Sequence, residues 1–181
     1  MKINGIIKDN PDYIVELDKI NFLTETDNDI KQFCIWLSRA DLTIVSFRCR
    51  RGVWSQGLDL SSLKPKIIID IFTAIVANPK ITELDLSRCN LYGIRNRETL
   101  ETIYSILNQK KFTSVNVADN KLSSAFLYQL ILWASLCTEK LYLSKNLLGS
   151  ASFDNLAQLL QAVHANENLC ELHLDSCELD R

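Results

Sequence analysis

Glycine and proline are scarce in this chain, with five and three residues among 181, so long flexible linkers are not expected. The N-terminal segment MKINGIIKDNPDY contains no apolar core of the length that a secretory signal peptide needs. No apolar run approaches the roughly 20 residues that span a bilayer. We therefore expect neither a signal peptide nor a membrane partner.

A basic excess is also missing. The chain has 20 Lys and Arg against 22 Asp and Glu, a net charge of -2, which argues against a general nucleic-acid binder. The only dense basic cluster is formed by Arg48, Arg50 and Arg51, with Trp54 nearby. A phosphate-binding patch is the alternative for this cluster, but a solvated loop or a protein contact is favoured.

Signatures of catalysis are missing as well. The sequence contains no GxGxxG or GxxxxGK[ST] loop, no GxSxG elbow and no HExxH motif. Histidine occurs twice, at His164 and His173. His173, Asp175 and Ser176 are near one another, but residues 173 and 175 of one strand have Cα atoms about 6.5 Å apart, which does not build a triad. We expect no enzyme, no cofactor and no metal site.

The six cysteines contain no CxxC pair, so neither a zinc ribbon nor a thioredoxin motif is supported. Their even number leaves disulfides open as the alternative. A chain of this length builds a core without such staples. We interpret the cysteines as reduced and mostly buried.

A repeated pattern dominates the second half of the chain. Four segments, starting at Ile81, Phe112, Thr138 and Leu169, follow L-x-x-L-x-L-x-x-[N/C]-x-L, although Thr138 departs from its first position. Their central apolar pairs are Leu84/Leu86, Val115/Val117, Leu141/Leu143 and Leu172/Leu174. Successive pairs are 31, 26 and 31 residues apart. Such self-similarity is typical of a stacked array in which neighbouring repeats bury one another.

Each repeat predicts the same local structure. The two central apolar residues alternate with period two, so they point into the core and the residue between them points out. The Asn or Cys position ends the strand, and a buried side chain there can hydrogen-bond the turning backbone, Cys more weakly than Asn. Helices are predicted from the 3.6-residue periodicity over Arg97–Gln109, Ser123–Leu136 and Phe153–Ala165.

The N-terminal third is less regular. It predicts strands at Val15/Leu17 and Val45/Phe47, and helices over Asp29–Arg39 and Pro65–Ala77. Arg50 then stands at the Asn position, and the segment RRGVWSQGLDLSS is either an insertion loop or a cap-like elaboration. We expect one continuous solenoid, with a cap and degenerate repeats over residues 1–80 and regular repeats over residues 81–181.

The pattern resembles leucine-rich repeats of the ribonuclease-inhibitor-like subtype, best in the segment from Phe153 to Leu174. The resemblance implies an α/β horseshoe with parallel strands on the concave face and helices on the convex face, and a role in binding a partner protein. The irregular repeats with their Ile, Asn and Lys content also resemble Legionella-type bacterial effectors. That likeness implies action in a host-cell cytosol; otherwise we expect a cytoplasmic protein.

Outward residues on neighbouring strands should form columns about 4.8 Å apart. The column between the core positions is Glu16, Ser46, Asp85, Asn116, Tyr142, His173. The next is Asp18, Arg48, Ser87, Ala118, Ser144, Asp175, and the third is Lys19, Cys49, Arg88, Asp119, Lys145, Ser176. The candidate partner-binding residues are Asp85, Arg88, Asn116, Asp119, Tyr142, Lys145, His173 and Asp175. Pairs such as Arg88 with Asp119 and Lys140 with Glu171 have an alternative role, in stabilising the sheet alone.

The two edges of the array need cover. Ile3, Ile6 and Ile7 could cap the first edge. At the other, CELDR directly follows a strand, so Leu172, Leu174 and Leu179 have an open flank. We expect self-association through this edge, or a piece of a longer array. The leading hypothesis is a protein-interaction module, and the alternative is a structural or sensor fragment of a larger multidomain protein.

Overall fold

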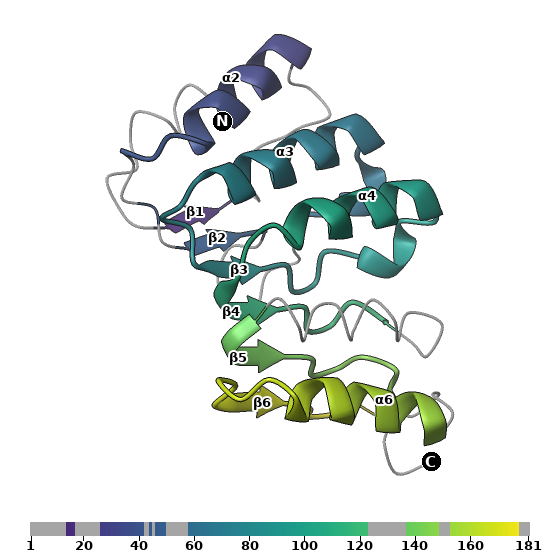
Figure 1. The fold of residues 1–181 in the computed structure, drawn as a ribbon. Coiled ribbons are helices and arrows are strands. Elements are labelled where there is room, and N and C mark those ends of the chain that lie inside the picture. The colour runs from purple at the N-terminus through teal and green to yellow at the C-terminus, as the bar shows by residue number, and fades with distance from the viewer. Residues whose placement is uncertain are drawn as a thin grey trace.

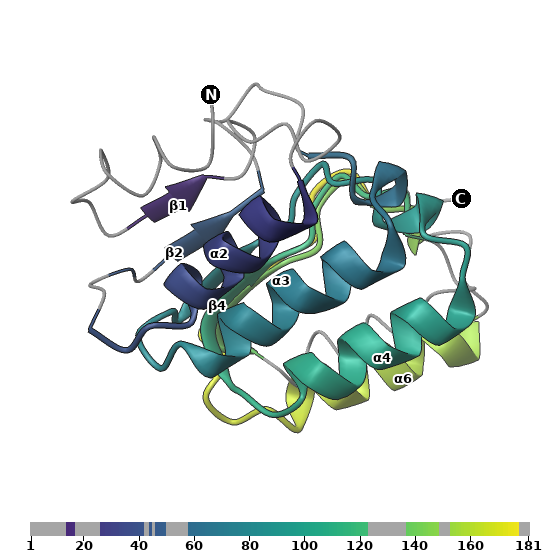
Figure 2. The ribbon, with the colours of Figure 1, turned by 90° about the horizontal axis from the view of Figure 1, so that it is seen from above.

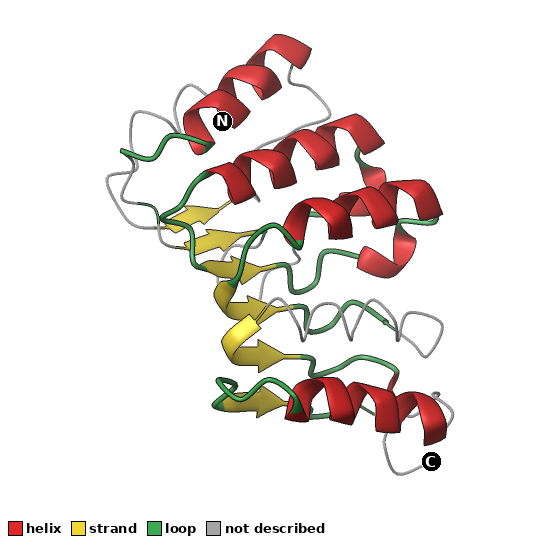
Figure 3. Cartoon of the chain, in the orientation of Figure 1, coloured by secondary structure: helices red, strands yellow, loops and turns green. Residues whose placement is uncertain are grey.

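A computed structural model describes residues 14–16, 26–41, 44, 46–49, 58–122, 137–148 and 153–177 of the chain. In chain order the described elements are β1 (Ile14–Glu16), α2 (Asp27–Leu37), β2 (Ser46–Arg48), η2 (Leu60–Ser62), α3 (Pro65–Ala77), β3 (Glu83–Asp85), η3 (Leu91–Gly93), α4 (Arg97–Leu107), β4 (Phe112–Asn116), β5 (Cys137–Tyr142), α6 (Phe153–His164) and β6 (Glu171–His173). Figure 3 shows helices and strands following one another along the chain.

The six described strands form one parallel sheet whose spatial order, β1 to β6, is their order in the sequence. The described α-helices lie on one side of this sheet, and α2, α3 and α4 are stacked beside one another (Figures 1 and 2). A parallel pair requires a crossover connection, and α2, α3, α4 and α6 provide it for the strands that precede and follow each of them. The arrangement confirms the predicted α/β fold with parallel strands, and it is leucine-rich-repeat-like.

The inward residues of the strands form the core. Leu84, Leu86, Val115, Val117, Leu141 and Leu143 are each at most 1% exposed. Val15, Phe47, Leu84, Val115, Leu141 and Leu172 are neighbours across the sheet, in that order. Burial of these side chains, each worth about 1.5–3 kcal/mol, holds the repeats together.

The predicted register of the second strand was wrong by two residues. Phe47, not Val45, aligns with Leu84, and Cys49 takes the second inward position with 1% exposure. Arg48 therefore joins Asp85 in the outward column, where Ser46 was expected. A shift of two residues preserves the alternation of inward and outward side chains, so the period alone does not fix the register. Val45 and Arg50 lie outside the described residues.

The described helices agree with their predicted positions, α3 to the residue and the others within two residues at each end. Thr26 begins α2 with a capping box, in which the Thr26 hydroxyl accepts from the Asp29 N–H and the Asp29 carboxylate accepts from the Thr26 N–H. Asn96 caps α4 by accepting from the Thr99 N–H at 2.9 Å. The predicted helix Ser123–Leu136 lies outside the described residues.

Two short 3-10 helices, η2 and η3, are absent from the sequence-based prediction. They pack together, because the Asn90 amide donates to Asp59 Oδ1 at 3.1 Å and to Ser61 Oγ at 2.9 Å. The Leu60 N–H donates to the Cys89 carbonyl at 3.0 Å. The end of the RRGVWSQGLDLSS segment is therefore part of a repeat, and its residues 50–57 lie outside the described ones.

Two buried asparagine side chains, Asn120 and Asn146, each link their own repeat to the one before it. Asn120 Oδ1 accepts from the backbone N–H groups of Cys89 and Leu91 at 3.0 and 3.1 Å. Asn146 Oδ1 accepts in the same way from Asn120 and Leu122, at 3.1 and 3.0 Å. Both side chains are at most 1% exposed. We call these contacts the asparagine ladder.

The same two side chains also donate hydrogen bonds to carbonyl groups of the preceding repeat. Asn120 Nδ2 donates to the Leu86 carbonyl at 2.9 Å, and Asn146 Nδ2 donates to the Val117 carbonyl at 3.1 Å. Cys177, at the equivalent position, contacts the Leu143 carbonyl through its thiol at 3.4 Å. These bonds confirm that this position supports the turning backbone and that Cys does so with fewer bonds than Asn.

A second link joins the helix ends. Asn78, which follows α3 and is fully buried, donates from Nδ2 to the Leu37 carbonyl at the end of α2 at 2.8 Å. Lys110, which follows α4, donates from Nζ to the Asn78 carbonyl. Consecutive helices are thus tied at their carboxyl ends, on the side of the molecule where the chain returns to the sheet.

Replacing Asn120 with Ala should lower the free energy of unfolding by about 2–4 kcal/mol, because buried N–H and carbonyl groups on two repeats lose their partner. Urea denaturation followed by circular dichroism measures this loss. The matched control is Asn108→Ala at the exposed C-cap of α4, which should change stability by less than about 0.5 kcal/mol. Equal losses for the two variants would contradict the ladder's role.

Candidate functional site

The outward side chains of β2 to β6 lie on the face of the sheet opposite the helices, and we call this surface the open face. Its residues are Ser46, Arg48, Glu83, Asp85, Ser114, Asn116, Lys140, Tyr142, Glu171 and His173. The register brings together four of the predicted partner-binding residues, in the column Asp85, Asn116, Tyr142, His173.

A cleft of about 290 Å³ lies on this face over β2 to β5. Its charged lining consists of two cations, Arg48 and Lys140, and two carboxylates, Glu83 and Asp85. Tyr142 lines it as well. The cleft thus presents both signs of charge beside an aromatic ring.

One part of the open face is organised by contacts among its own side chains. Tyr142 and His173 stack with ring centroids 4.3 Å apart and an interplanar angle of 13°. Lys140 Nζ lies 2.8 Å from Glu171 Oε1, which confirms the predicted pair. Glu171 Oε2 lies 3.6 Å from His173 Nε2. Four side chains from β5 and β6 therefore form one connected cluster, the Tyr142–His173 cluster.

Electrostatics within the cluster follow from these contacts. The hydrogen bond from Lys140 holds the pKa of the Glu171 carboxyl below its usual range, with His173 adding to the effect. The same bond raises the pKa of Lys140. Burial raises the pKa of the Tyr142 hydroxyl, and the nearby Glu171 carboxylate adds to this. Lys140 and Glu171 are therefore held in their charged forms and Tyr142 in its neutral form.

Two of the predicted binding residues also support their own backbone. Asp85 Oδ1 accepts from the Ser87 N–H at 2.9 Å and from the Ser87 hydroxyl at 2.6 Å. Asn116 Oδ1 accepts from the Ala118 N–H at 3.0 Å. These bonds close the chain at the ends of β3 and β4, as Asx turns do. Replacing either residue would perturb the strand ends as well as the surface.

The remaining predicted residues lie at the carboxyl ends of the strands. Arg88 Nε and Asp119 Oδ2 form an ion pair at 2.9 Å, as expected from their column. Lys145 is exposed, and Asp175 accepts from the Ser144 hydroxyl at 3.2 Å. Four residues of the third column have backbone φ angles between 56° and 59°, namely Arg88, Asp119, Lys145 and Ser176. This left-handed backbone turns the chain away from the sheet at the same point in each repeat, so these residues form a rim separate from the cleft.

Sequence reasoning missed Glu83 and placed Arg48 in the wrong column. Glu83 stands just before the first inward leucine of its repeat, as Lys140 and Glu171 do in theirs. Alternation puts this position on the same face as the residue two places later. The outward position of Glu83 could therefore be predicted from the sequence. The column of Arg48 could not, because it depends on the register of β2.

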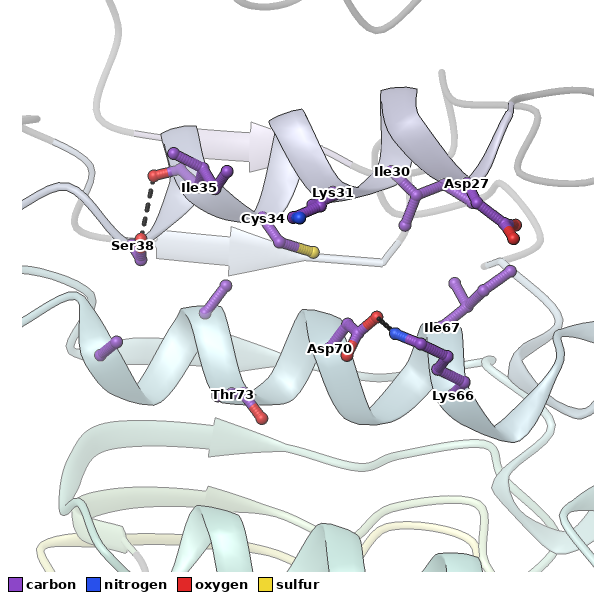
Figure 4. Close-up of a pocket in the computed structure, with 12 residues that line it drawn as sticks. Asp27, Ile30, Lys31, Cys34, Ile35, Ser38, Lys66, Ile67, Asp70 and Thr73 are labelled. Carbon is purple, nitrogen blue, oxygen red and sulfur yellow. Dashed lines mark hydrogen bonds and ion pairs between the residues drawn. The ribbon is translucent and has the colours of Figure 1, made fainter.

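A larger groove lies on the helical side, between α2 and α3 (Figure 4). It has a volume of about 630 Å³ and apolar lining from Ile30, Ile67, Ala74 and other residues. Burial raises the pKa of the Cys34 thiol in this groove to about 12, and the neighbouring Asp70 carboxylate adds to the shift. The thiol is therefore protonated and weakly reactive at neutral pH.

In the part of the chain that the structure describes, no group of three or more His, Cys, Asp or Glu side chains could hold a metal ion. No described helix has the length and apolar character to cross a membrane. Described cysteines at positions 34, 49, 89, 170 and 177 are free thiols, and 49, 89 and 177 are buried.

No protein-family model and no curated protein matches this chain. Similar solved structures include leiomodin-1 actin-binding site 2, with 15% identity, a TM-score of 0.48, and coverage of 91% of this chain and 87% of that one. They also include the tropomodulin C-terminal domain from Caenorhabditis elegans, with 12% identity, a TM-score of 0.37, and coverage of 86% and 67%.

We expect iodoacetamide to modify Cys34 at least about tenfold more slowly than the exposed Cys170 at pH 8, because the thiolate is the reactive form. Peptide mass spectrometry resolves the two sites. In denaturant the two rates should converge, since unfolding removes the burial that raises the Cys34 pKa. Equal rates in the native protein would contradict the buried environment of this thiol.

Proposed function

We propose that this chain is a protein-interaction module whose open face binds a partner protein. In this proposal the sheet is the concave face of a horseshoe-shaped solenoid of the ribonuclease-inhibitor-like type. The observation that carries it is the cleft on the open face, where Arg48 and Glu83 stand beside Tyr142. Tyrosine and arginine are enriched among the residues that dominate binding energy at protein interfaces.

The charges of the cleft favour recognition over a purely stabilising role. Lys140 is paired with Glu171. No described ion-pair partner lies within 4 Å of Arg48 or Glu83, although the Arg48 Nε donates to the Ser46 hydroxyl at 3.2 Å. Charged side chains on a sheet that served stability alone would gain most by pairing across the strands. Arg48 and Glu83 are instead free to pair with charges of opposite sign on a partner.

The cations and carboxylates that line the cleft also indicate which class of molecule it binds. A nucleic acid would require a surface dominated by cations, but this cleft has equal numbers of cations and carboxylates. A drug-sized ligand favours an apolar pocket, and most residues around this cleft are polar. A protein surface carrying both signs of charge meets these conditions, so we assign a binding role rather than an enzymatic one.

Action in a host-cell cytosol, as a bacterial effector, is supported by the irregular repeats of the sequence and by its Ile, Asn and Lys content. The alternative is a structural or sensor fragment of a larger multidomain protein. A partner that binds through the open face is compatible with either setting.

Affinity capture with quantitative mass spectrometry tests the open face. The test variant replaces Arg48, Glu83 and Tyr142 with Ala. The matched control replaces Arg97, Glu98 and Tyr92 with Ala, which removes the same residue types from the exposed surface of η3 and α4. We expect the test variant to lose at least about 90% of a partner that the wild type and the control retain. Such a loss corresponds to a decrease of about 1.4 kcal/mol or more in binding free energy.

Circular dichroism and urea denaturation establish that both variants are folded. If the test variant still captures every partner that the wild type captures, the open face is not the binding surface. If the control alone loses the partner, binding occurs on the side of the helices.

A further inference from the structure

The ring of Tyr142 presents one face to His173 and the other to the cleft on the open face. The two rings are nearly parallel, with centroids 4.3 Å apart and an interplanar angle of 13°. His173 stands on β6, on one side of β5, so the opposite face of the Tyr142 ring is directed towards β4 on the other side. This second face borders the cleft, because Tyr142 is one of the residues that line it.

The side chains of β4 leave room in front of this ring face. Ser114 and Asn116 are the residues of β4 that line the cleft. Asn116 is the direct neighbour of Tyr142, but its Oδ1 accepts from the Ala118 N–H at 3.0 Å, so its side chain is held along its own strand. The cleft of about 290 Å³ therefore has an aromatic wall on β5 and short side chains on its floor.

The opposite wall of the cleft is formed by carboxylates of β3. Glu83 and Asp85 line it from this strand, which lies two strands from Tyr142, roughly 9–10 Å away at the usual strand spacing. Glu83 is flanked across the sheet by Ser46 and Ser114, so its neighbours bring hydroxyls and no cation. Burial is the main cause that raises the pKa of the Tyr142 hydroxyl, and the charge of Glu83 is among the smaller ones. The two walls therefore face one shared space.

The cleft is anionic once its internal ion pair is counted. Its charged lining residues are Arg48, Glu83, Asp85 and Lys140. Lys140 Nζ lies 2.8 Å from Glu171 Oε1 of β6, so its charge is already balanced by a carboxylate. Two carboxylates and one cation remain in the lining, which leaves a net charge of -1. The cleft therefore favours a positively charged group.

We propose that the cleft takes an arginine side chain of the partner protein, with its guanidinium stacked on Tyr142 and paired with the carboxylate of Glu83. The inference rests on the proposed function and names the chemical group through which the open face recognises its partner. The guanidinium continues the stack of His173 on Tyr142 as a third plane. At the 4.3 Å spacing of that stack, it lies over β4, between the ring and the carboxylates of β3.

The geometry favours a guanidinium over an ammonium group. A guanidinium is planar, so its face stacks on an aromatic ring while its edge donates to a carboxylate. The cleft makes these two demands from two directions, with the ring of Tyr142 on β5 and the carboxylate of Glu83 on β3. The ammonium of lysine is a compact and strongly hydrated charge that has no plane to stack. Arginine should therefore bind more tightly than lysine.

NMR titration of the full chain with small probes tests this assignment. The probes are N-acetyl-L-arginine amide, N-acetyl-L-lysine amide and N-acetyl-L-citrulline amide, whose urea group is planar but uncharged. We expect the arginine probe to shift the backbone amide signals of β3 to β5 in a saturable way. Its dissociation constant should be at least about fivefold lower than that of the lysine probe and about tenfold lower than that of the citrulline probe.

Two substitutions should change the affinity for the arginine probe in opposite directions. Glu83→Gln removes the paired carboxylate, and we expect it to raise the dissociation constant at least about fivefold. Arg48→Gln removes a like charge, and we expect it to lower the constant by about twofold or more. The control Glu98→Gln removes a carboxylate from the exposed first turn of α4 and should leave the constant unchanged. Damage to the fold cannot produce two effects of opposite sign.

The ring is tested through the preference between the two cationic probes. Tyr142→Leu keeps an apolar side chain but removes the aromatic face. We expect the affinities for the arginine and lysine probes to become nearly equal, because Glu83 still attracts both. The control Tyr92→Leu, at an exposed position of η3, should leave the preference unchanged. Circular dichroism establishes that each variant is folded.

Three results would overturn the assignment. The first is an arginine probe that binds the wild type no more tightly than the citrulline probe does. The second is a dissociation constant that Glu83→Gln leaves unchanged. The third is a preference for arginine that survives Tyr142→Leu, since the stacked ring is then not its cause.

These results are distinguishable from a failure of the proposed function. Suppose that the variant lacking Arg48, Glu83 and Tyr142 loses its captured partner, but the arginine probe does not bind the wild type. The open face then binds its partner through other chemistry, and only the present inference fails. If the arginine probe binds as expected while that variant retains every partner, no partner uses the cleft, and a partner arginine is ruled out together with the proposed function.

Discussion

The asparagine ladder is the interaction on which the rest of this structure depends. A parallel strand of three residues forms few hydrogen bonds with each neighbour, and the chain must turn at once to reach its helix. The turning backbone is buried, so its N–H and carbonyl groups need partners inside the protein. Asn120 and Asn146 supply them, because an amide offers both an acceptor and two donors.

The ladder also explains where the surface residues stand. Each ladder side chain fixes the end of its own strand and of the preceding one, so residues at the same place in successive repeats become neighbours across the sheet. The Tyr142–His173 stack and the Lys140–Glu171 pair lie at the next junction, between β5 and β6, which has no ladder asparagine. Where the ladder position is Cys177, a thiol replaces the amide and binds more weakly, at the β5–β6 junction that holds both contacts. The coupling of β6 to the sheet therefore depends more on its side chains than the coupling of β5 does.

Much of this could be predicted from residues alone. The period of two within Leu84/Leu86 and its equivalents separates core from surface, and the Asn position identifies the turn. The register of β2 could not be predicted in this way, because Val45, Phe47 and Cys49 all have the same parity and suit burial. Pairing to β3 decides between them. The stack of Tyr142 on His173 follows from their column, but the choice of Glu171 as a shared partner depends on side-chain conformations that no spacing encodes.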